Sequence, residues 1–162
     1  MMNNKITLKD VVFEDFLNYK KPSMFLIFPT CDFKCCKEAG CNICQNMNII
    51  KQPNLSVDVQ DLINKYLSNP ITKAVVCGGL EPLDSLEDLY YFIESFRAVC
   101  DDDIVIYTGY RNGEISTVVQ YLKQYKGIIL KYGRFIPGQK EHFDEVLGVN
   151  LANDEQYAER IS

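Results

Sequence analysis

Five of the seven cysteines in this 162-residue chain fall within one short segment, which reads PTCDFKCCKEAGCNICQN. Cys31 and Cys35 are separated by three residues, and Cys41 and Cys44 by two. Thiolates without a nearby histidine are the ligands that soft metals and iron–sulfur clusters prefer. Cysteines that merely pack as small apolar residues are not expected at this density. The segment therefore predicts a metal or cluster site.

The cysteine spacing alone leaves two kinds of centre open. Four cysteines in two close pairs could form a structural zinc site with tetrahedral geometry. They could equally supply the ligands of an iron–sulfur cluster. In both cases we expect Cys36, the second member of a doublet, to be a bystander, because adjacent cysteines rarely both bind one centre.

A glycine-rich segment, GGLEP at residues 78–82, follows an apolar run. Glycines allow a ligand to approach the backbone closely and permit positive φ angles. An ordinary turn between a strand and a helix would explain the segment equally well, since Gly and Pro are common in turns. By itself this segment does not separate a ligand site from a turn.

A third feature is YTGY, residues 107–110, at the end of another apolar run. The hydroxyl groups of Thr108 and Tyr110 could form hydrogen bonds with a ribose or a carboxylate. The alternative is a strand end with two tyrosines in the core. Both interpretations stay open from these residues alone.

The elements that must position these segments are predicted by hydrophobic patterning. Continuous apolar runs, which are typical of strands buried on both faces of a parallel sheet, occur at residues 24–28, 73–77, 104–107 and 127–131. Helical patterns separate these runs, with Ser56 and Ser85 as expected caps and a third helix over residues 115–125.

Alternating strands and helices predict an α/β fold with right-handed crossovers and a parallel sheet. The chain is too short for eight βα units, so we expect a partial, open TIM-like barrel, with residues 1–162 as one domain. Ligands in such folds bind beyond the carboxyl ends of the strands. The cysteine loop, GGLEP and YTGY should all meet there.

These motifs, taken together, resemble the radical S-adenosylmethionine family. CDFKC and CNICQN are similar to the two halves of its CxxxCxxC loop, here separated by the insertion CKEAG. The resemblance implies that Cys31, Cys35 and Cys44 bind a [4Fe–4S] cluster, with Cys41 as the substitute middle ligand. GGLEP resembles the family's GGEP with one additional residue, Leu80.

YTGY and the stretch KYGRFIPGQ resemble one subfamily, the activating proteins of anaerobic ribonucleotide reductases. The resemblance implies that S-adenosyl-L-methionine binds at five residues and that no side chain is itself catalytic, since the cluster and the cofactor carry the chemistry. These cofactor-binding residues are Gly78, Gly79, Glu81, Thr108 and Tyr110.

The activity implied by the resemblance is reductive cleavage of S-adenosylmethionine to a 5′-deoxyadenosyl radical. This radical would install a glycyl radical on a partner enzyme, expected to be an anaerobic ribonucleotide reductase, with a flavodoxin- or ferredoxin-like electron donor. Two alternatives are a radical enzyme of the same type that acts on a small molecule or peptide, and a zinc-stabilised binding module.

Charge and composition exclude several other classes. The net charge of −5 argues against a nucleic-acid surface, which needs clustered Lys and Arg. The N-terminus lacks an apolar signal core and no run approaches membrane-spanning length, so we expect a cytoplasmic protein without membrane contact. His142 is the one histidine, which argues against hydrolytic triads.

Overall fold

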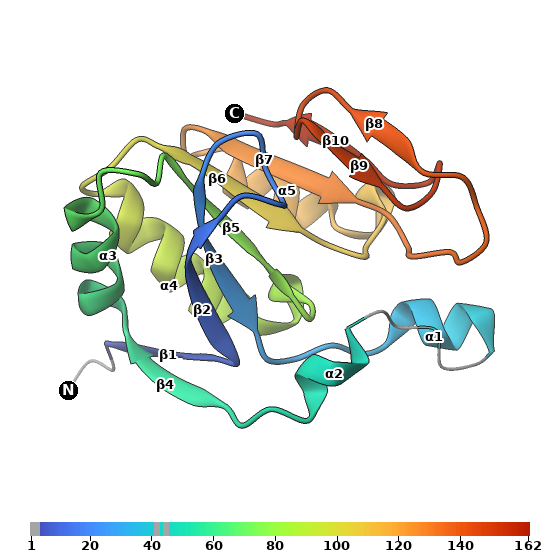
Figure 1. The fold of residues 1–162 in the computed structure, drawn as a ribbon, viewed down its shortest axis with the longest axis horizontal. Helices are drawn as coiled ribbons and strands as arrows, with labels where there is room; N and C mark the ends of the chain where they lie inside the picture. The colour runs from blue at the N-terminus through green and yellow to red at the C-terminus, as the bar shows by residue number, and fades with distance from the viewer. Residues whose placement is uncertain (1–3, 41–42, 44–45) are drawn as a thin grey trace.

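A six-stranded, mostly parallel β-sheet forms the centre of the fold (Figure 1). The computed structural model describes residues 4–40, 43 and 46–162. The strand order is β10-β7-β6-β5-β3-β2, in which the four central strands are parallel and the two edge strands are antiparallel. The strands are β2 (Asp10–Asp15), β3 (Ser23–Phe28), β5 (Ala74–Gly79), β6 (Asp103–Tyr107), β7 (Ile128–Tyr132) and β10 (Tyr157–Arg160).

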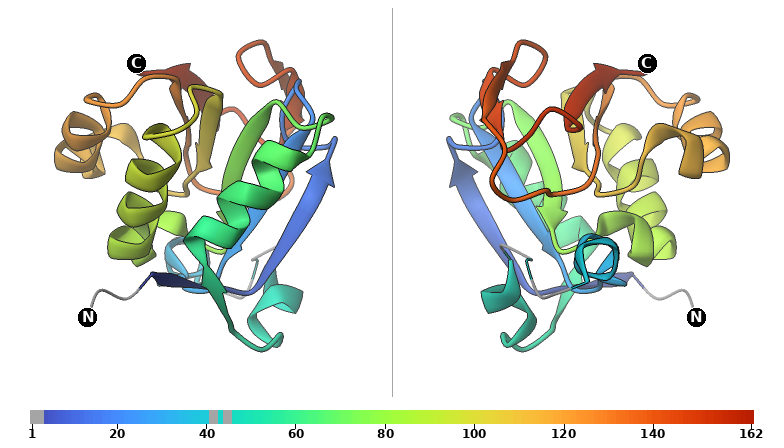
Figure 2. Two further views of the ribbon diagram at one scale, coloured as in Figure 1. Left: turned by 90° about the vertical axis from the view of Figure 1, so that its left-hand side faces the viewer. Right: turned by 90° about the vertical axis from the view of Figure 1, so that its right-hand side faces the viewer.

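The central strands are buried on both faces, which explains their continuous apolar sequences. Val75 and Cys77 belong to a core shared with the helices, whereas Val76 belongs to a second core under the C-terminal hairpin. Figure 2 shows the helices on one side of the sheet and the hairpin on the other. The elements are α3 (Val59–Ser68), α4 (Leu86–Arg97) and α5 (Ser116–Leu122), and the hairpin strands β8 (His142–Asp144) and β9 (Val149–Leu151).

The four predicted strands are confirmed as β3, β5, β6 and β7, and the expected α/β class with a mostly parallel sheet is confirmed. The strands pair as an open sheet with β2 and β10 at its edges. A barrel is not shown by the pairing of the described strands.

The helix predicted after Ser56 is present as α3, but Ser56 does not cap it. Ser56 lies in strand β4 (Leu55–Asp58), where it pairs with Thr7 of strand β1 (Lys5–Leu8). The cap is Asp58, whose carboxylate accepts a hydrogen bond of 3.0 Å from the Asp61 amide. The prediction was wrong by two residues because pairing with β1 extends the strand to the start of the helix.

The helix predicted after Ser85 is confirmed as α4, but the Ser85 side chain forms no capping hydrogen bond. Asp88, in the first turn of α4, accepts a hydrogen bond of 3.0 Å from the amide of Thr7, far away in sequence. Among the described residues, no helix is long and apolar enough to span a membrane. The remaining helices are the short segments α1 (Lys34–Ala39), α2 (Met47–Ile50), η1 (Pro82–Ser85) and η2 (Asn112–Glu114).

The amino-terminal side of the sheet is closed by polar contacts around Asp103, the first residue of β6. Its carboxylate accepts hydrogen bonds from Tyr19 at 2.6 Å, from Lys21 at 3.1 Å and from both terminal nitrogens of Arg160 at 3.2 Å. These contacts join an edge strand and the turn before β3 to the sheet centre. They therefore stabilise the edge of the sheet at which the parallel strands begin.

Candidate functional site

A cavity of about 330 Å³ lies at the carboxyl ends of the parallel strands. It is lined by residues of the cysteine loop, GGLEP and YTGY, so the three segments predicted to converge are brought together. The sheet register explains this, because Phe28, the last residue of β3, pairs with Gly79 of β5. Tyr107 of β6 likewise pairs with Lys131 of β7. Four strands thus contribute to one cavity.

The described part of the cysteine loop places two sulfurs on this cavity. Cys31 follows β3, and Cys35 lies in the first turn of α1. The turn between them uses Phe33 with φ 59°, a left-handed conformation that is unusual for a bulky residue. Cys31 Sγ accepts a hydrogen bond of 3.2 Å from the Phe33 amide. The predicted ligands Cys41 and Cys44 lie outside the described residues.

Burial keeps the Cys31 thiol from being an activated nucleophile in its protein surroundings. Cys31, Cys35 and Cys36 are free cysteines. Burial raises the pKa of the Cys31 thiol to about 11, so its protein surroundings do not by themselves produce a reactive thiolate. Coordination to a metal would supply the missing stabilisation of the thiolate. Cys36 is buried, and its assignment as a bystander stays a prediction.

The two glycines of GGLEP lie on the cavity but are required for different reasons. Gly79 has φ +83°, and a Cβ there would lie 2.4 Å from Cγ2 of Ile27. A Cβ on Gly78 would lie 3.0 Å from the ring of Phe25. The Gly79 carbonyl accepts a hydrogen bond of 2.8 Å from the side chain of Asn46, the last residue of the cysteine segment. The strand end therefore has backbone on the cavity where side chains do not fit.

Glu81 connects all three segments. It is 3% exposed, and its Oε1 atom accepts hydrogen bonds from Lys34 Nζ at 3.2 Å and from the Gly109 amide at 2.8 Å. Its Oε2 atom accepts a hydrogen bond from the Leu83 amide. Because these protein groups occupy both carboxylate oxygens, Glu81 organises the site from within.

Lys34, between the first two cysteines, is the cation of this network. Its ammonium lies 2.9 Å from Asp32 and 3.8 Å from Asp84, and 4.0 Å from the centre of the Tyr110 ring. Burial alone would lower the pKa of Lys34, but the neighbouring carboxylates, first that of Glu81, raise it above the usual value. Lys34 is therefore a fixed positive charge in the wall of the cavity.

The YTGY segment is placed beside these residues by β6. Thr108 is buried on the cavity, where its hydroxyl accepts a hydrogen bond of 3.0 Å from the Tyr110 amide. Tyr110 does not line the cavity, and its hydroxyl donates to Asp84. A Cβ on Gly109 would lie 3.6 Å from Cys35 Sγ. The glycine thus leaves free space beside this sulfur.

A comparison with protein families matches residues 23–150 to the 4Fe–4S single cluster domain. The chain belongs to this family. The match runs from the first residue of β3 to beyond β7 and includes the whole cysteine loop. No curated protein and no solved structure matches the chain.

The described residues of this 4Fe–4S domain fit a cluster. Cys31 and Cys35 provide soft sulfur donors on one cavity, and no histidine lines it among the described residues. The Phe135 amide donates a hydrogen bond of 3.3 Å to Cys35 Sγ, as is common for cluster ligands. Asp32 and Asp84 also lie within 4.8 Å of the Cys31 sulfur, but both are paired with Lys34. The thiols are therefore the donors available to the cluster.

Lys131 of the 4Fe–4S domain was missed by sequence reasoning, which treated it as the end of an apolar strand. Its side chain lines the cavity, and its Nζ atom lies 3.4 Å from the carbonyl oxygens of Thr108 and Gly133. No carboxylate of the described residues forms an ion pair with it. Burial lowers the pKa of Lys131 to about 8. A lysine inside an otherwise apolar strand was the available signal.

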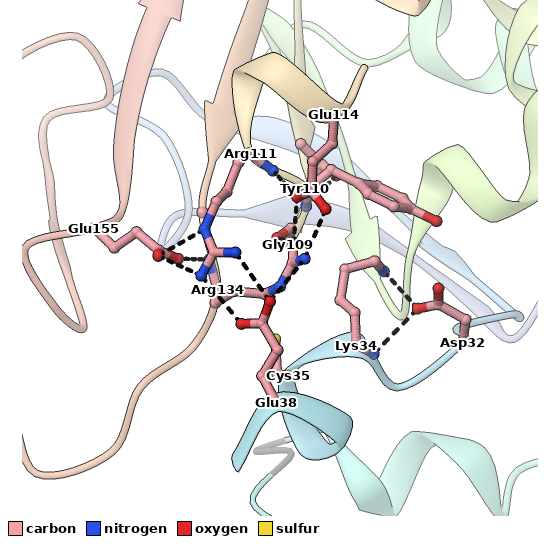
Figure 3. A network of polar contacts seen from close by, with 12 residues as sticks. Asp32, Lys34, Cys35, Glu38, Gly109, Tyr110, Arg111, Glu114, Arg134 and Glu155 are labelled. Carbon is pink, nitrogen blue, oxygen red and sulfur yellow. Dashed lines mark hydrogen bonds and ion pairs between the residues drawn. The ribbon is translucent and has the colours of Figure 1, made fainter. Parts of the chain in front are cut away.

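A second network, also missed, joins helix α1 to the loop after β7 (Figure 3). Arg134 is 5% exposed and donates to both carboxylate oxygens of Glu114, at 2.8 and 2.9 Å. It also lies 3.2 Å from Glu38 of α1, which receives two further hydrogen bonds from Arg111. We call Arg134, Arg111, Glu38 and Glu114 the arginine clasp. Glu38 belongs to the CKEAG insertion, which is thus held against the rest of the site.

Proposed function

We propose that this 4Fe–4S protein is a radical S-adenosylmethionine enzyme that installs a glycyl radical on a partner enzyme. The observation that carries the proposal is the convergence of the cysteine loop, GGLEP and YTGY on one cavity at the ends of adjacent parallel strands. A zinc-stabilised binding module would not need a cavity beside its cysteines. On this proposal the mostly parallel sheet is the wall of an open barrel.

The cluster would be held by Cys31, Cys35 and Cys44, with Cys41 as the substitute middle ligand. When bound, the reduced cluster and the cofactor supply the chemistry, cleavage of S-adenosylmethionine to methionine and a 5′-deoxyadenosyl radical. The protein binds and orients the cofactor and excludes water.

The cavity provides complementary groups for the cofactor. The ammonium of Lys131 faces the cavity without a carboxylate partner and would bind the carboxylate of the methionine moiety. Backbone at Gly78 and Gly79 offers close approach to its amino group. Glu81, Thr108 and Tyr110 would act by holding these loops, because their side chains form hydrogen bonds with protein partners.

The size of the cavity supports a protein substrate. About 330 Å³ is at the lower end of the range for small-molecule sites, so one cofactor would occupy most of it. The hydrogen donor would then enter from outside as an extended loop that also covers the cavity. A glycyl-radical enzyme, specifically an anaerobic ribonucleotide reductase, presents such a glycine, and a flavodoxin- or ferredoxin-like protein would reduce the cluster.

Anaerobic reconstitution with iron and sulfide, followed by reduction and addition of S-adenosylmethionine, tests the proposal. We expect 5′-deoxyadenosine, and a glycyl doublet in the paramagnetic resonance spectrum when an anaerobic reductase is present. Deuteration of the partner's glycine should collapse the doublet. A fully loaded cluster without 5′-deoxyadenosine would contradict the radical chemistry. Rapid cofactor turnover on a small molecule, with no protein radical, would contradict the activating role.

A further inference from the structure

The Cys35 sulfur receives a hydrogen bond from a part of the chain that is remote in sequence. The Phe135 amide lies 3.3 Å from Cys35 Sγ, and no other acceptor for this amide is present among the described residues. We infer that this amide, positioned by Arg134, raises the reduction potential of the cluster. The inference rests on the proposed function only in taking Cys35 as a cluster ligand.

The direction of the effect follows from charge. Reduction adds one electron to a cluster whose sulfurs already carry negative charge. A hydrogen-bond donor to a ligand sulfur stabilises the more negative, reduced state more than the oxidised state. The Phe135 amide should therefore make the cluster easier to reduce. Without it, the electron donor would need a lower potential.

The backbone before Phe135 leaves the amide little freedom. Gly133 has φ +107°, and a Cβ there would lie 2.6 Å from the carbonyl oxygen of Glu155. The Gly133 amide donates a hydrogen bond of 3.0 Å to the Tyr110 carbonyl, and the Arg134 amide donates to the Glu155 carboxylate. The loop is thus fixed to the YTGY segment on one side and to the C-terminal segment on the other.

The arginine clasp fixes the other partner of the bond, the helix that carries Cys35. Arg134 Nη1 donates to the Gly109 carbonyl, beside the Cys35 sulfur, and its guanidinium binds Glu114 through both nitrogens. Its contact with Glu38 reaches the last turn of α1. One buried arginine, which directly precedes Phe135 in the chain, therefore binds α1 through Glu38. Figure 3 shows the contacts of Arg134 with Glu38 and Glu114.

Paired substitutions at residue 135 isolate the amide from the ring. Phe135→Ala and Phe135→Pro both remove the ring from the cavity wall, but Phe135→Pro also removes the N–H group. We expect a lower midpoint potential for Phe135→Pro than for Phe135→Ala, measured by titration of the reduced-cluster resonance signal. Equal potentials would overturn the inference.

The next residue provides a matched control. The Ile136 amide donates a hydrogen bond of 3.2 Å to the Asn153 side chain and none to a sulfur. Ile136→Pro and Ile136→Ala should therefore have the same potential. If Ile136→Pro lowers the potential as much as Phe135→Pro does, loop distortion is the cause and the inference is wrong.

A measurement on the unaltered backbone covers the case in which Phe135→Pro does not assemble a cluster. Protein labelled with ¹⁵N-phenylalanine should show weak ¹⁵N hyperfine couplings to the reduced cluster from two amides, that of Phe135 at Cys35 Sγ and that of Phe33 at Cys31 Sγ. Phe135→Leu keeps the amide but leaves it unlabelled, so the Phe135 coupling should be lost while the Phe33 coupling and the cluster stay. Identical ¹⁵N couplings in the labelled wild type and in labelled Phe135→Leu would overturn the inference.

Arg134→Lys tests the positioning role. Lysine keeps the positive charge, but its single ammonium cannot replace the two guanidinium nitrogens that bind Glu114 and Glu38. We expect a lower midpoint potential and a weaker ¹⁵N coupling. An unchanged potential would show that Arg134 does not position the amide. Cys35→Ala tests separately whether Cys35 is a cluster ligand. If Cys35→Ala retains a full cluster, the ligand assignment is wrong.

Discussion

Lys34 and Glu81 form an ion pair of 3.2 Å in which both side chains are less than a tenth exposed. The pair joins the cysteine loop to GGLEP, and Glu81 continues the connection to YTGY through the Gly109 amide. Three loops from three different strands therefore share one buried carboxylate. The relative position of these three loops depends on this carboxylate.

Removal of the Lys34 charge should lower both the stability of the fold and the iron content of the protein. Lys34→Met leaves the Glu81 carboxylate buried without its cation, which costs on the order of 3–5 kcal/mol. We expect a matching fall in the free energy of unfolding, measured with urea, and a loss of iron content. Lys37→Met, an exposed position on the same helix, is the control and should change little. Equal stability of the two variants would contradict the role of the pair.

Acid should weaken the closed end of the sheet through Asp103. Burial opposes ionisation of Asp103, but hydrogen bonds from Arg160, Tyr19 and Lys21 lower its pKa to about 2, below the ordinary 3.8. Its ionised form therefore stabilises the fold above about pH 4, and this contribution is lost as the pH falls towards 2. The expected size is on the order of 2 kcal/mol.

Urea unfolding of the wild type and of Asp103→Asn between pH 7 and pH 3 measures this contribution. The difference in stability between the two proteins should be largest at pH 7 and should shrink with acid. A difference that stays constant down to pH 3 would show that Asp103 contributes no ionisation-linked stability.

Binding of S-adenosylmethionine should depend on the protonation of Lys131. Because burial lowers the pKa of Lys131 to about 8, the free protein loses this cation as the pH rises through 8. Affinity for the cofactor should fall over the same range, as measured by calorimetry on the reconstituted protein. Lys131→Arg should bind equally at pH 7 and pH 9, and Lys131→Met should bind weakly at both. A wild-type affinity that does not change from pH 7 to pH 9 would contradict this role.

The cysteines should differ in their effect on the cluster. Cys31→Ala removes a sulfur that lies on the cavity, so we expect loss of the cluster absorption and of acid-labile sulfide. Cys36→Ala, one residue beyond Cys35, should retain both. Retention of a full cluster by Cys31→Ala would remove Cys31 from the ligand set.

Gly79 should be important for folding as well as for the site. Gly79 has a φ of +83°, which is unfavourable for alanine. In Gly79→Ala the new Cβ would also clash with Ile27 of the neighbouring strand, at 2.4 Å from its Cγ2 atom. We expect a loss of about 1–3 kcal/mol in the free energy of unfolding. Gly113→Ala, where a Cβ has nothing within 4 Å, is the control. A stable Gly79→Ala protein that fails only to bind the cofactor would show that the glycine serves the ligand alone.

The parallel sheet could be predicted because its strands carry their signal locally. Val75, Val76 and Cys77 are all fully buried, and neighbouring residues of a strand point to opposite faces of the sheet. A strand that is buried on both faces therefore has an uninterrupted apolar sequence. The convergence of the three loops then follows, since the carboxyl ends of parallel strands share one edge. No such local signal shows that Ser56 belongs to a strand, because its strand forms only by pairing with Thr7 of β1.

The organisation within the site could not be predicted from local sequence. Glu81 was expected to contact the cofactor, but which way its side chain points depends on Lys34 and Gly109, which belong to other loops. The arginine clasp similarly joins residues from three separate segments. These contacts depend on packing between distant elements, which single-residue patterns do not encode.

The hydrogen bond between Phe135 and Cys35 joins residues that are 100 positions apart. At roughly 5–20 residues per second, a ribosome makes the cysteine loop several seconds before it makes the loop that completes it. During this interval the nascent chain presents bare thiols without the strand and arginine that later hold them. The hydrogen-bonded surroundings of Cys35 are therefore complete only after residue 135 has been made. A cell that makes this protein must keep those thiols reduced until then.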